Sequence, residues 1–278
     1  LEFAASSSVN VSTTGTGAID LDGLGALTLS DVDTVNGAIT ASSAGALTVT
    51  DVASGTNGNI VLSTTSGDIT GLATVNAGSG NVTLNSAGAI VDDGSSATVI
   101  TGGVLTADAA GAITIDSTVT SANISTSAAG AVDLDETDGI TLTDIDTTDG
   151  SITVDAGGLI TATDVVAAGG SGDSVTLSTT TGGAVATLVT GADAVSITAN
   201  AGDITVGAIT ATAGTLGVTA TAGSINDAAD DNTADFTAGG LITLTAQDEI
   251  GVLGSGSDTD LEFAASSSVN VSTTGTGA

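Results

Sequence analysis

The 278-residue sequence contains no Cys, Pro, Met, Trp, Tyr, His, Lys or Arg, and its aromatic residues are three Phe. The lack of Cys excludes disulfide bonds, and the scarcity of aromatic residues and Met disfavours the irregular core of an ordinary globular domain. Because Lys and Arg are absent, the 32 Asp and Glu residues have no cationic side chain as partner, and the formal net charge is −32. Such a chain repels phosphates, so binding to nucleic acid is excluded.

Catalysis is also disfavoured by this inventory. General acid–base and nucleophilic catalysis rely mainly on His, Cys, Lys or Tyr, which are missing here. Carboxylate pairs could in principle catalyse glycoside hydrolysis. Apart from the three Phe, however, the chain lacks the aromatic and basic residues that would hold a sugar beside them. We therefore expect no enzymatic activity. The apolar runs are too short and too rich in Gly and Thr for a membrane-spanning helix, so no membrane span is expected.

A short phrase recurs along the chain, in which a Gly precedes alternating apolar and polar residues. Its clearest copies are GALTLSDV at 25–32 and GALTVTDV at 45–52, with related phrases at 111–115, 139–145 and 158–165. Strict alternation is typical of a β-strand with one buried face. A strand this short cannot bury that face alone, so the copies must stack on one another.

The spacing of the phrases indicates the fold class. Their glycines recur at intervals of about 20–22 residues, for example at Gly17, Gly37, Gly58 and Gly80. This period fits one coil of a parallel β-helix with two or three short strands, so we predict an all-β solenoid. A 260-residue length would hold about 12 or 13 such coils. Tandem β-sandwich domains are the alternative, but they predict Tyr or Trp core anchors and a period near 90 residues.

The chain also contains a long duplication. Residues 1–18 reappear unchanged as 261–278, an offset of 260 residues (261 − 1). An engineered overlap would explain this, but large tandem units suit extended repetitive proteins better. We therefore expect 1–278 to be one continuous solenoid segment of a longer protein, in which 1–260 is one tandem unit and 261–278 begins the next.

Four Asp residues are the candidate metal ligands. Asp31, Asp51, Asp144 and Asp164 occupy the same place in their phrases, and Asp31 and Asp51, like Asp144 and Asp164, are separated by one period. The paired residues should lie on adjacent coils, about 4.8 Å apart along the backbone. Such carboxylates repel each other unless water, a proton or a cation intervenes. A ladder of weak Ca²⁺ sites is one interpretation, and calcium is the one cofactor suggested. Corner capping, in which each Asp accepts a backbone N–H, is the other.

Further surface patterns follow from the same alternation. The acidic stretches 133–136 and 144–146 would bind cations or simply form a solvated acidic surface. The 31 carboxylates of one 260-residue unit (32 − 1), spread over about 60 Å, approach one charge per roughly 2 Å and should attract counterions. Thr pairs such as Thr48 and Thr50 should face solvent, an arrangement found on ice-binding β-helices but more often on ordinary soluble strands.

The phrases resemble a known family. Their Gly-Ala-aliphatic-Thr-aliphatic pattern is similar to the repeat region of filamentous-haemagglutinin-like large exoproteins, as is GSIND at 223–227 followed by TAGGLITLT at 237–245. The resemblance implies a right-handed parallel β-helix, secretion to the extracellular bacterial surface, and an adhesive or structural role.

Two functional hypotheses remain. The first is a structural segment of a giant repetitive extracellular or cell-surface fibre or sheath, which contacts neighbouring copies of itself end to end or laterally while divalent cations offset the charge. The second is an adhesin stalk or binding module that contacts a receptor or glycan through irregular loops at 92–103 and 224–240.

Overall fold

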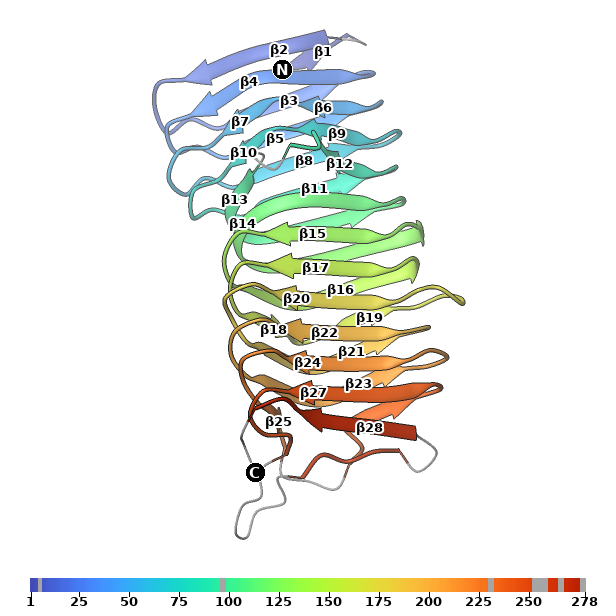
Figure 1. Ribbon diagram of the computed structural model, residues 1–278. Helices are drawn as coiled ribbons and strands as arrows, with labels where there is room; N and C mark the ends of the chain where they lie inside the picture. The colour runs from blue at the N-terminus through green and yellow to red at the C-terminus, as the bar shows by residue number, and fades with distance from the viewer. Residues whose placement is uncertain (5–6, 96–98, 230–232, 252–259, 265–267, 276–278) are drawn as a thin grey trace. The chain divides into compact units, whose positions relative to one another are not determined.

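The computed structural model describes residues 1–278 except 5–6, 96–98, 230–232, 252–259, 265–267 and 276–278. The described residues form 28 β-strands and no helix. The strands are parallel and stacked in coils, so the fold is a β-solenoid of about 10 coils (Figure 1). The predicted fold class is confirmed. The chain divides into two compact units, Leu1–Asp135 and Glu136–Ala278.

In the first unit each complete coil has three strand segments, which form the faces A1, B1 and C1. Face A1 contains β1 (Glu2–Phe3), β3 (Ile19–Gly23), β5 (Ile39–Ser43), β8 (Ile60–Thr64) and β11 (Val82–Ser86). Face B1 contains β6 (Leu47–Val49), β9 (Ile69–Leu72) and β12 (Ile90–Asp92), and face C1 contains β7 (Asp51–Ala53) and β10 (Thr74–Asn76). Longer strands cover more than one face: β2 (Ser7–Thr13) and β4 (Leu27–Thr34) run from B1 to C1, β13 (Val99–Ala109) runs from C1 to A1, and β14 (Ile113–Ala129) covers all three.

The second unit repeats this arrangement with faces A2, B2 and C2. Face A2 contains β17 (Ile152–Ala156), β20 (Val175–Thr179), β22 (Val195–Ala199), β24 (Leu216–Ala220), β27 (Leu241–Ala246) and β28 (Ser268–Thr273). Face B2 contains β18 (Ile160–Ala162) and β25 (Ile225–Asp227), and face C2 contains β19 (Val165–Ala167) and β26 (Phe236–Ala238). The strands β16 (Ile140–Asp149), β21 (Ala184–Gly191) and β23 (Ile204–Ala211) run from B2 to C2, and β15 (Val132–Glu136) contains the boundary between the units.

The core consists of columns of aliphatic side chains that run from coil to coil. On face B1, Leu27 pairs with Leu47, and Leu47 pairs with Ile69. These side chains are buried, as is Val49. The polar residues between them face outward because successive side chains of a strand point to opposite sides. Each coil therefore shields the interior of its neighbours, as the alternation predicted.

The coils differ in length more than the sequence suggested. Ile19 pairs with Ile39 across a short coil, whereas Val75 pairs with Ile100 across a longer one. Near the C-terminus, the coil that joins Ile209 to its partner Phe236 is longer still. Inserted loops lengthen these coils without disturbing the ladder.

Glycine and buried hydroxyl groups close the coil corners. A Cβ atom on Gly58 would overlap the carbonyl oxygen of Gly37, which occupies the same corner one coil earlier. Beside this corner, the buried Thr34 hydroxyl donates to the Gly37 carbonyl at 2.7 Å and accepts its N–H at 2.8 Å. Close approach of the backbones thus explains why the Gly17, Gly37, Gly58 and Gly80 spacing is so regular.

The two irregular segments are smaller than expected. In 92–103, strand β13 already begins at Val99, and Gly102 pairs with Val119 instead of lying in a loop. In 224–240, strands β25 and β26, of three residues each, lie on either side of a connecting segment, of which 230–232 lies outside the described residues. In the part of the chain that the structure describes, no helix is long and apolar enough to cross a membrane.

Candidate functional site

Three carboxylates gather where face B1 meets face C1. Asp31 and Asp51 occupy equivalent places on adjacent coils, because Val32 pairs with Val52 in the next position. The predicted adjacency of this pair is therefore confirmed. Asp33 completes the group, which we name corner cluster 1 (Asp31, Asp33 and Asp51). The amide of Asn10 donates to Oδ2 of Asp31 at 2.9 Å.

Corner cluster 1 contains no cationic side chain, and this affects the pKa values of its carboxyl groups. Burial is the main factor that raises the pKa of Asp33, followed by its hydrogen bond with Asp31 and the charges of Asp31 and Asp51. The pKa of Asp51 is also raised, by burial and then by the charge of Asp31. The carboxylates thus repel one another, which favours their protonated forms. Asp33 was missed by the sequence reasoning, although its two-residue spacing from Asp31 places both on the outward side.

A second cluster lies at the corresponding corner of the second unit. Ile145 pairs with Val165, so Asp144 and Asp164, which precede them, lie on adjacent coils as predicted. With Asp146 they form corner cluster 2. The pKa of Asp146 is raised by burial, then by the charges of Asp144 and Asp164, and by a hydrogen bond with Asp144. Oδ1 of Asp164 is buried and has no hydrogen-bond partner.

Corner capping through a backbone N–H is made by other carboxylates: Asp68 accepts the N–H of Ala89 at 2.8 Å, and Asp203 accepts that of Ser224 at 2.8 Å. Within the described residues, no group of three or more Asp, Glu, His or Cys side chains is arranged to hold a metal ion. Calcium binding at Asp31, Asp51, Asp144 and Asp164 stays a prediction.

A carboxyl pair formed by a buried Asp and a half-buried Glu, which the sequence did not indicate, lies near the C-terminus. Asp235 is 6% exposed, and its Oδ2 accepts the backbone N–H of Glu262 at 2.8 Å. Burial, the charges of Asp227 and Glu262 and a hydrogen bond with the Glu262 carboxyl raise the pKa of Asp235 to about 7, against the lowering effect of the Glu262 N–H. The rings of Phe236 and Phe263 stack beside this pair, with centroids 5.4 Å apart. These contacts hold the start of the second sequence copy against face C2.

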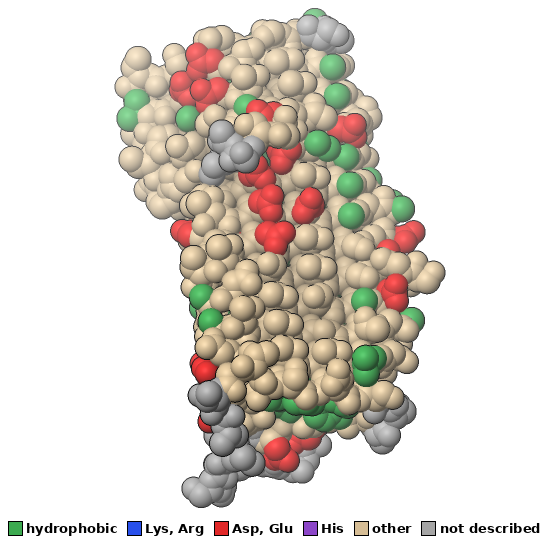
Figure 2. Space-filling model, viewed as in Figure 1, with side chains coloured by type: hydrophobic (Ala, Val, Ile, Leu, Met, Phe, Trp, Pro, Cys, Tyr) green, Lys and Arg blue, Asp and Glu red, His purple; other side chains and the backbone are tan. Residues whose placement is uncertain are grey.

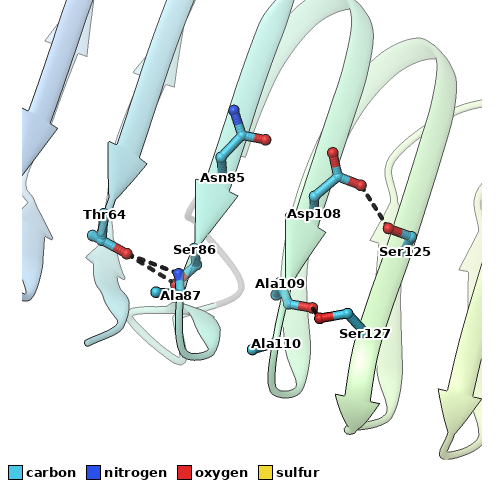
Figure 3. Close-up of a pocket in the computed structure, with 9 residues that line it drawn as sticks. All are labelled: Thr64, Asn85, Ser86, Ala87, Asp108, Ala109, Ala110, Ser125 and Ser127. Atoms are coloured by element: carbon cyan, nitrogen blue, oxygen red, sulfur yellow. Dashed lines mark hydrogen bonds between the residues drawn. The ribbon is translucent and has the colours of Figure 1, made fainter. Parts of the chain in front are cut away.

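A shallow groove of about 340 Å³ lies on the first unit, between strands of face A1 and the loops that follow them (Figure 3). Its lining is mostly hydroxyl groups and Ala, with one carboxylate: Thr64, Asn85, Ser86, Ala87, Asp108, Ala109, Ala110, Ser125 and Ser127. The hydroxyl of Ser125 donates to Asp108 at 2.6 Å, and Thr64 accepts the N–H of Ala87 at 3.1 Å. Such a lining can exchange hydrogen bonds with a small polyhydroxy molecule, but it contains no base that would activate a hydroxyl as nucleophile.

From β20 to β27, face A2 presents an uncharged outer surface. From β20 to β27 its outward residues are hydroxyl-bearing or small, apart from Leu241 at the start of β27, and Figure 2 shows this part of the surface without acidic side chains. Two rows run from coil to coil, in register: Thr176, Ser196, Gly217 and Thr243 in one, and Ser178, Thr198, Thr219 and Thr245 in the other. In a chain with net charge −32, this is a surface that another copy can approach with little repulsion.

In comparisons with known proteins, no family model, no curated protein and no solved structure matches this chain. The geometry of the coils, clusters and faces is therefore the basis for any functional conclusion.

Proposed function

We propose that the chain is a structural segment of a repetitive extracellular or cell-surface fibre or sheath, acidic and non-catalytic. The observation that carries this proposal is the parallel register that continues from coil to coil within each unit, with the same aliphatic columns repeated. Stability then comes from many equivalent ladder hydrogen bonds and stacked side chains, as in other repeat proteins. The resemblance of the phrases to filamentous-haemagglutinin-like exoproteins supports the same role and the extracellular location.

The chemistry of the surface fits a material that contacts copies of itself. The uncharged part of face A2, from β20 to β27, is suited to lateral contact, because carboxylates elsewhere would repel each other. Divalent cations, calcium above all, would offset the charge of corner clusters 1 and 2. The absence of Lys and Arg removes every cleavage site for trypsin-like proteases, which suits exposed material.

An adhesin stalk or binding module is the second candidate. The hydroxyl-lined groove of face A1 favours it, since its side chains could contact a glycan. The irregular segment after β12 adds a polar loop, in which Asp92 accepts the N–H of Gly94 at 2.9 Å and Asp93 that of Ser95 at 2.8 Å.

Loop and groove variants of the full chain separate the two candidates. One variant carries Asp92→Ala and Asp93→Ala, and another carries Asn85→Ala and Asp108→Ala. A structural role predicts that both still form the filaments seen for the unchanged chain by negative-stain electron microscopy, and that none of the three binds a glycan array. Glycan binding that either variant abolishes, by a chain that forms no filaments, would overturn the structural proposal.

A further inference from the structure

The outer surface of face A2 carries free hydroxyl groups. In each strand of β20, β22, β24 and β27, two outward positions alternate with three buried ones, and the outward residues are Thr176, Ser178, Ser196, Thr198, Gly217, Thr219, Thr243 and Thr245. In the part of the chain that the structure describes, the hydroxyl of Thr245 lies 3.4 Å from that of Ser272, and the others make no hydrogen bond to another protein group. These groups are therefore available to a ligand outside the protein.

Face A1 uses its outward hydroxyl groups differently. There Ser42 donates to the carboxylate of Asp22 at 2.7 Å, and Ser125 donates to that of Asp108 at 2.6 Å. On face A2, from β20 to β27, no outward carboxylate competes for the hydroxyl groups. The free hydroxyl groups of face A2 are thus a local feature of this face and not a general property of the coils.

The two rows form a regular lattice on a rigid support. Their strands are paired in continuous register and lie in one layer (Figure 1). Hydroxyl groups therefore repeat about every 4.8 Å from coil to coil and about every 6.6 Å along a strand, where alternate residues share a face. The buried column Leu177, Ile197, Val218 and Leu244 lies directly beneath. Because the backbone is held from below, binding to this face costs little ordering.

The chemistry of this face restricts the ligand. Sites for small molecules are concave, whereas these rows lie along one layer of strands. No outward side chain from β20 to β27 is charged, so the face offers no partner to an ion or a charged polymer, and none is an aromatic ring on which a sugar could stack. A fitting ligand is neutral, extended, and able to donate and accept hydrogen bonds at regular intervals.

Ice has all of these properties. Its surface is neutral, every water molecule in it donates and accepts hydrogen bonds, and its prism faces repeat in two directions at spacings similar to those of the two hydroxyl rows. A single hydroxyl group gains little by exchanging liquid water for ice, because both form hydrogen bonds. A rigid lattice of such groups makes many contacts at once, so the small gains add up.

We propose that the outer surface of face A2, from β20 to β27, binds ice and slows its growth. The hydroxyl groups of the two rows hold water molecules at positions that the crystal can continue, so the bound protein becomes part of the ice surface and blocks the addition of water there. This activity goes beyond the fibre function and does not depend on it, because a single unit presents both rows.

Gly217 interrupts the first row and provides a test by gain of activity. A Cβ atom at Gly217 would have no atom within 4 Å, so a Thr side chain fits there without displacing a neighbour. Gly217→Thr in the full chain should complete the row and at least double the thermal hysteresis, which is the difference between the melting and freezing temperatures of a single ice crystal in the protein solution. Gly170, outside face A2, has the same open space. The matched control Gly170→Thr should leave the hysteresis unchanged.

A bulky substitution tests the same surface by loss of activity. Thr198→Tyr places a ring across the centre of the lattice and should reduce the hysteresis at least fivefold. Thr161 of β18 is half-buried like Thr198 but faces outward on face B2, so Thr161→Tyr should have no effect. Lateral contact between copies would cover the same face, so all variants are compared over a dilution series.

The outcomes separate this activity from the fibre function. Hysteresis that rises in Gly217→Thr and falls in Thr198→Tyr, but not in the two controls, supports ice binding by face A2, whether or not filaments form. An unchanged chain that shows no hysteresis and leaves the shape of growing ice crystals unaltered at every dilution would overturn ice binding and leave the fibre function standing. Hysteresis that responds equally to the substitutions at Thr198 and Thr161, or not at all to Gly217→Thr, would overturn the assignment to face A2.

Discussion

Buried hydroxyl groups show how single residues shape the coil. Thr34 lies among aliphatic side chains but uses its hydroxyl as both donor and acceptor to the backbone of Gly37. Thr147 and Thr179 are also buried and donate to the carbonyls of Gly150 and Gly182. A polar group in a core is tolerated when it is paired in this way. These Thr residues therefore close corners, although their alternation alone marks them as ordinary inward positions.

Replacement of Thr34 by Val should measure this contribution. Val keeps the volume but leaves the N–H and C=O of Gly37 without their side-chain partner, so we expect a loss of about 1–3 kcal/mol in the free energy of unfolding. The outward and exposed Thr40 provides the control, and Thr40→Val should change stability by less than about 0.5 kcal/mol. Chemical denaturation of both variants is the measurement. Equal effects at the two sites would contradict the corner role.

Asp235 should make the C-terminal coil sensitive to pH. Its pKa is raised from 3.8 to about 7 when folded, so the folded chain holds a proton that the unfolded chain releases between these values. The corresponding stability is present at low pH and is lost as the pH rises through about 7. Asp227 and Glu262 are the described carboxylates that act on it.

The variant Asp235→Asn should lose this dependence. We expect the unchanged chain to show weaker hydrogen-exchange protection around Glu262 at pH 8 than at pH 5, after correction for intrinsic rates, and the variant to show a smaller difference. Asp248→Asn, at an exposed site, is the control. Protection that increases from pH 5 to pH 8 in the unchanged chain would contradict this interpretation.

At the scale of the strand, the alternation of apolar and polar residues was enough to predict which side chains face the core and which strands are neighbours. The phrase at 45–52 predicts which side chains are buried, and the spacing of the phrases predicts that Asp31 and Asp51 lie side by side. The number of strands per coil could not be read, because β4 passes from face B1 to face C1 without any Gly, and two consecutive polar residues, Ser30 and Asp31, are the one sign of the corner. The Asp235–Glu262 contact could not be predicted either, since a coil of irregular length separates the two residues.

The corner clusters should respond to calcium if they bind it. Added Ca²⁺ would then raise the melting temperature by several degrees, because a ligand that binds the folded state stabilises it, and a chelator would reverse the shift. Asp31→Asn with Asp51→Asn should reduce the response, while Asp20→Asn with Asp248→Asn, at exposed sites, should preserve it. A melting curve that neither Ca²⁺ nor chelator alters would remove calcium from the account.

At the scale of the whole molecule, all charged side chains are acidic, and this determines how the stability of the fold depends on pH. The pKa values of Asp33, Asp51, Asp116, Asp146 and Asp235 are all raised, and burial is the first cause in each case. Raised values mean that the folded chain binds more protons than the unfolded chain, so stability falls as the pH rises above 3.8.

Thermal melts between pH 4.5 and pH 8 should therefore show the highest melting temperature at the acidic end. Added monovalent salt should raise the melting temperature at pH 8 and have a smaller effect at pH 4.5, because it screens repulsion among ionised carboxylates. A melting temperature that decreases steadily on acidification from pH 8 to pH 5 would show that ionised carboxylates stabilise the fold, contrary to this account.

The central claim is that stacked parallel coils continue from copy to copy to build a fibre. Cryo-electron microscopy of the full chain at high concentration tests it most directly. We predict unbranched filaments whose power spectrum has an axial reflection at about 4.8 Å, the spacing of neighbouring coils. Separate particles at every concentration, or filaments built of discrete sandwich modules without that reflection, would contradict it.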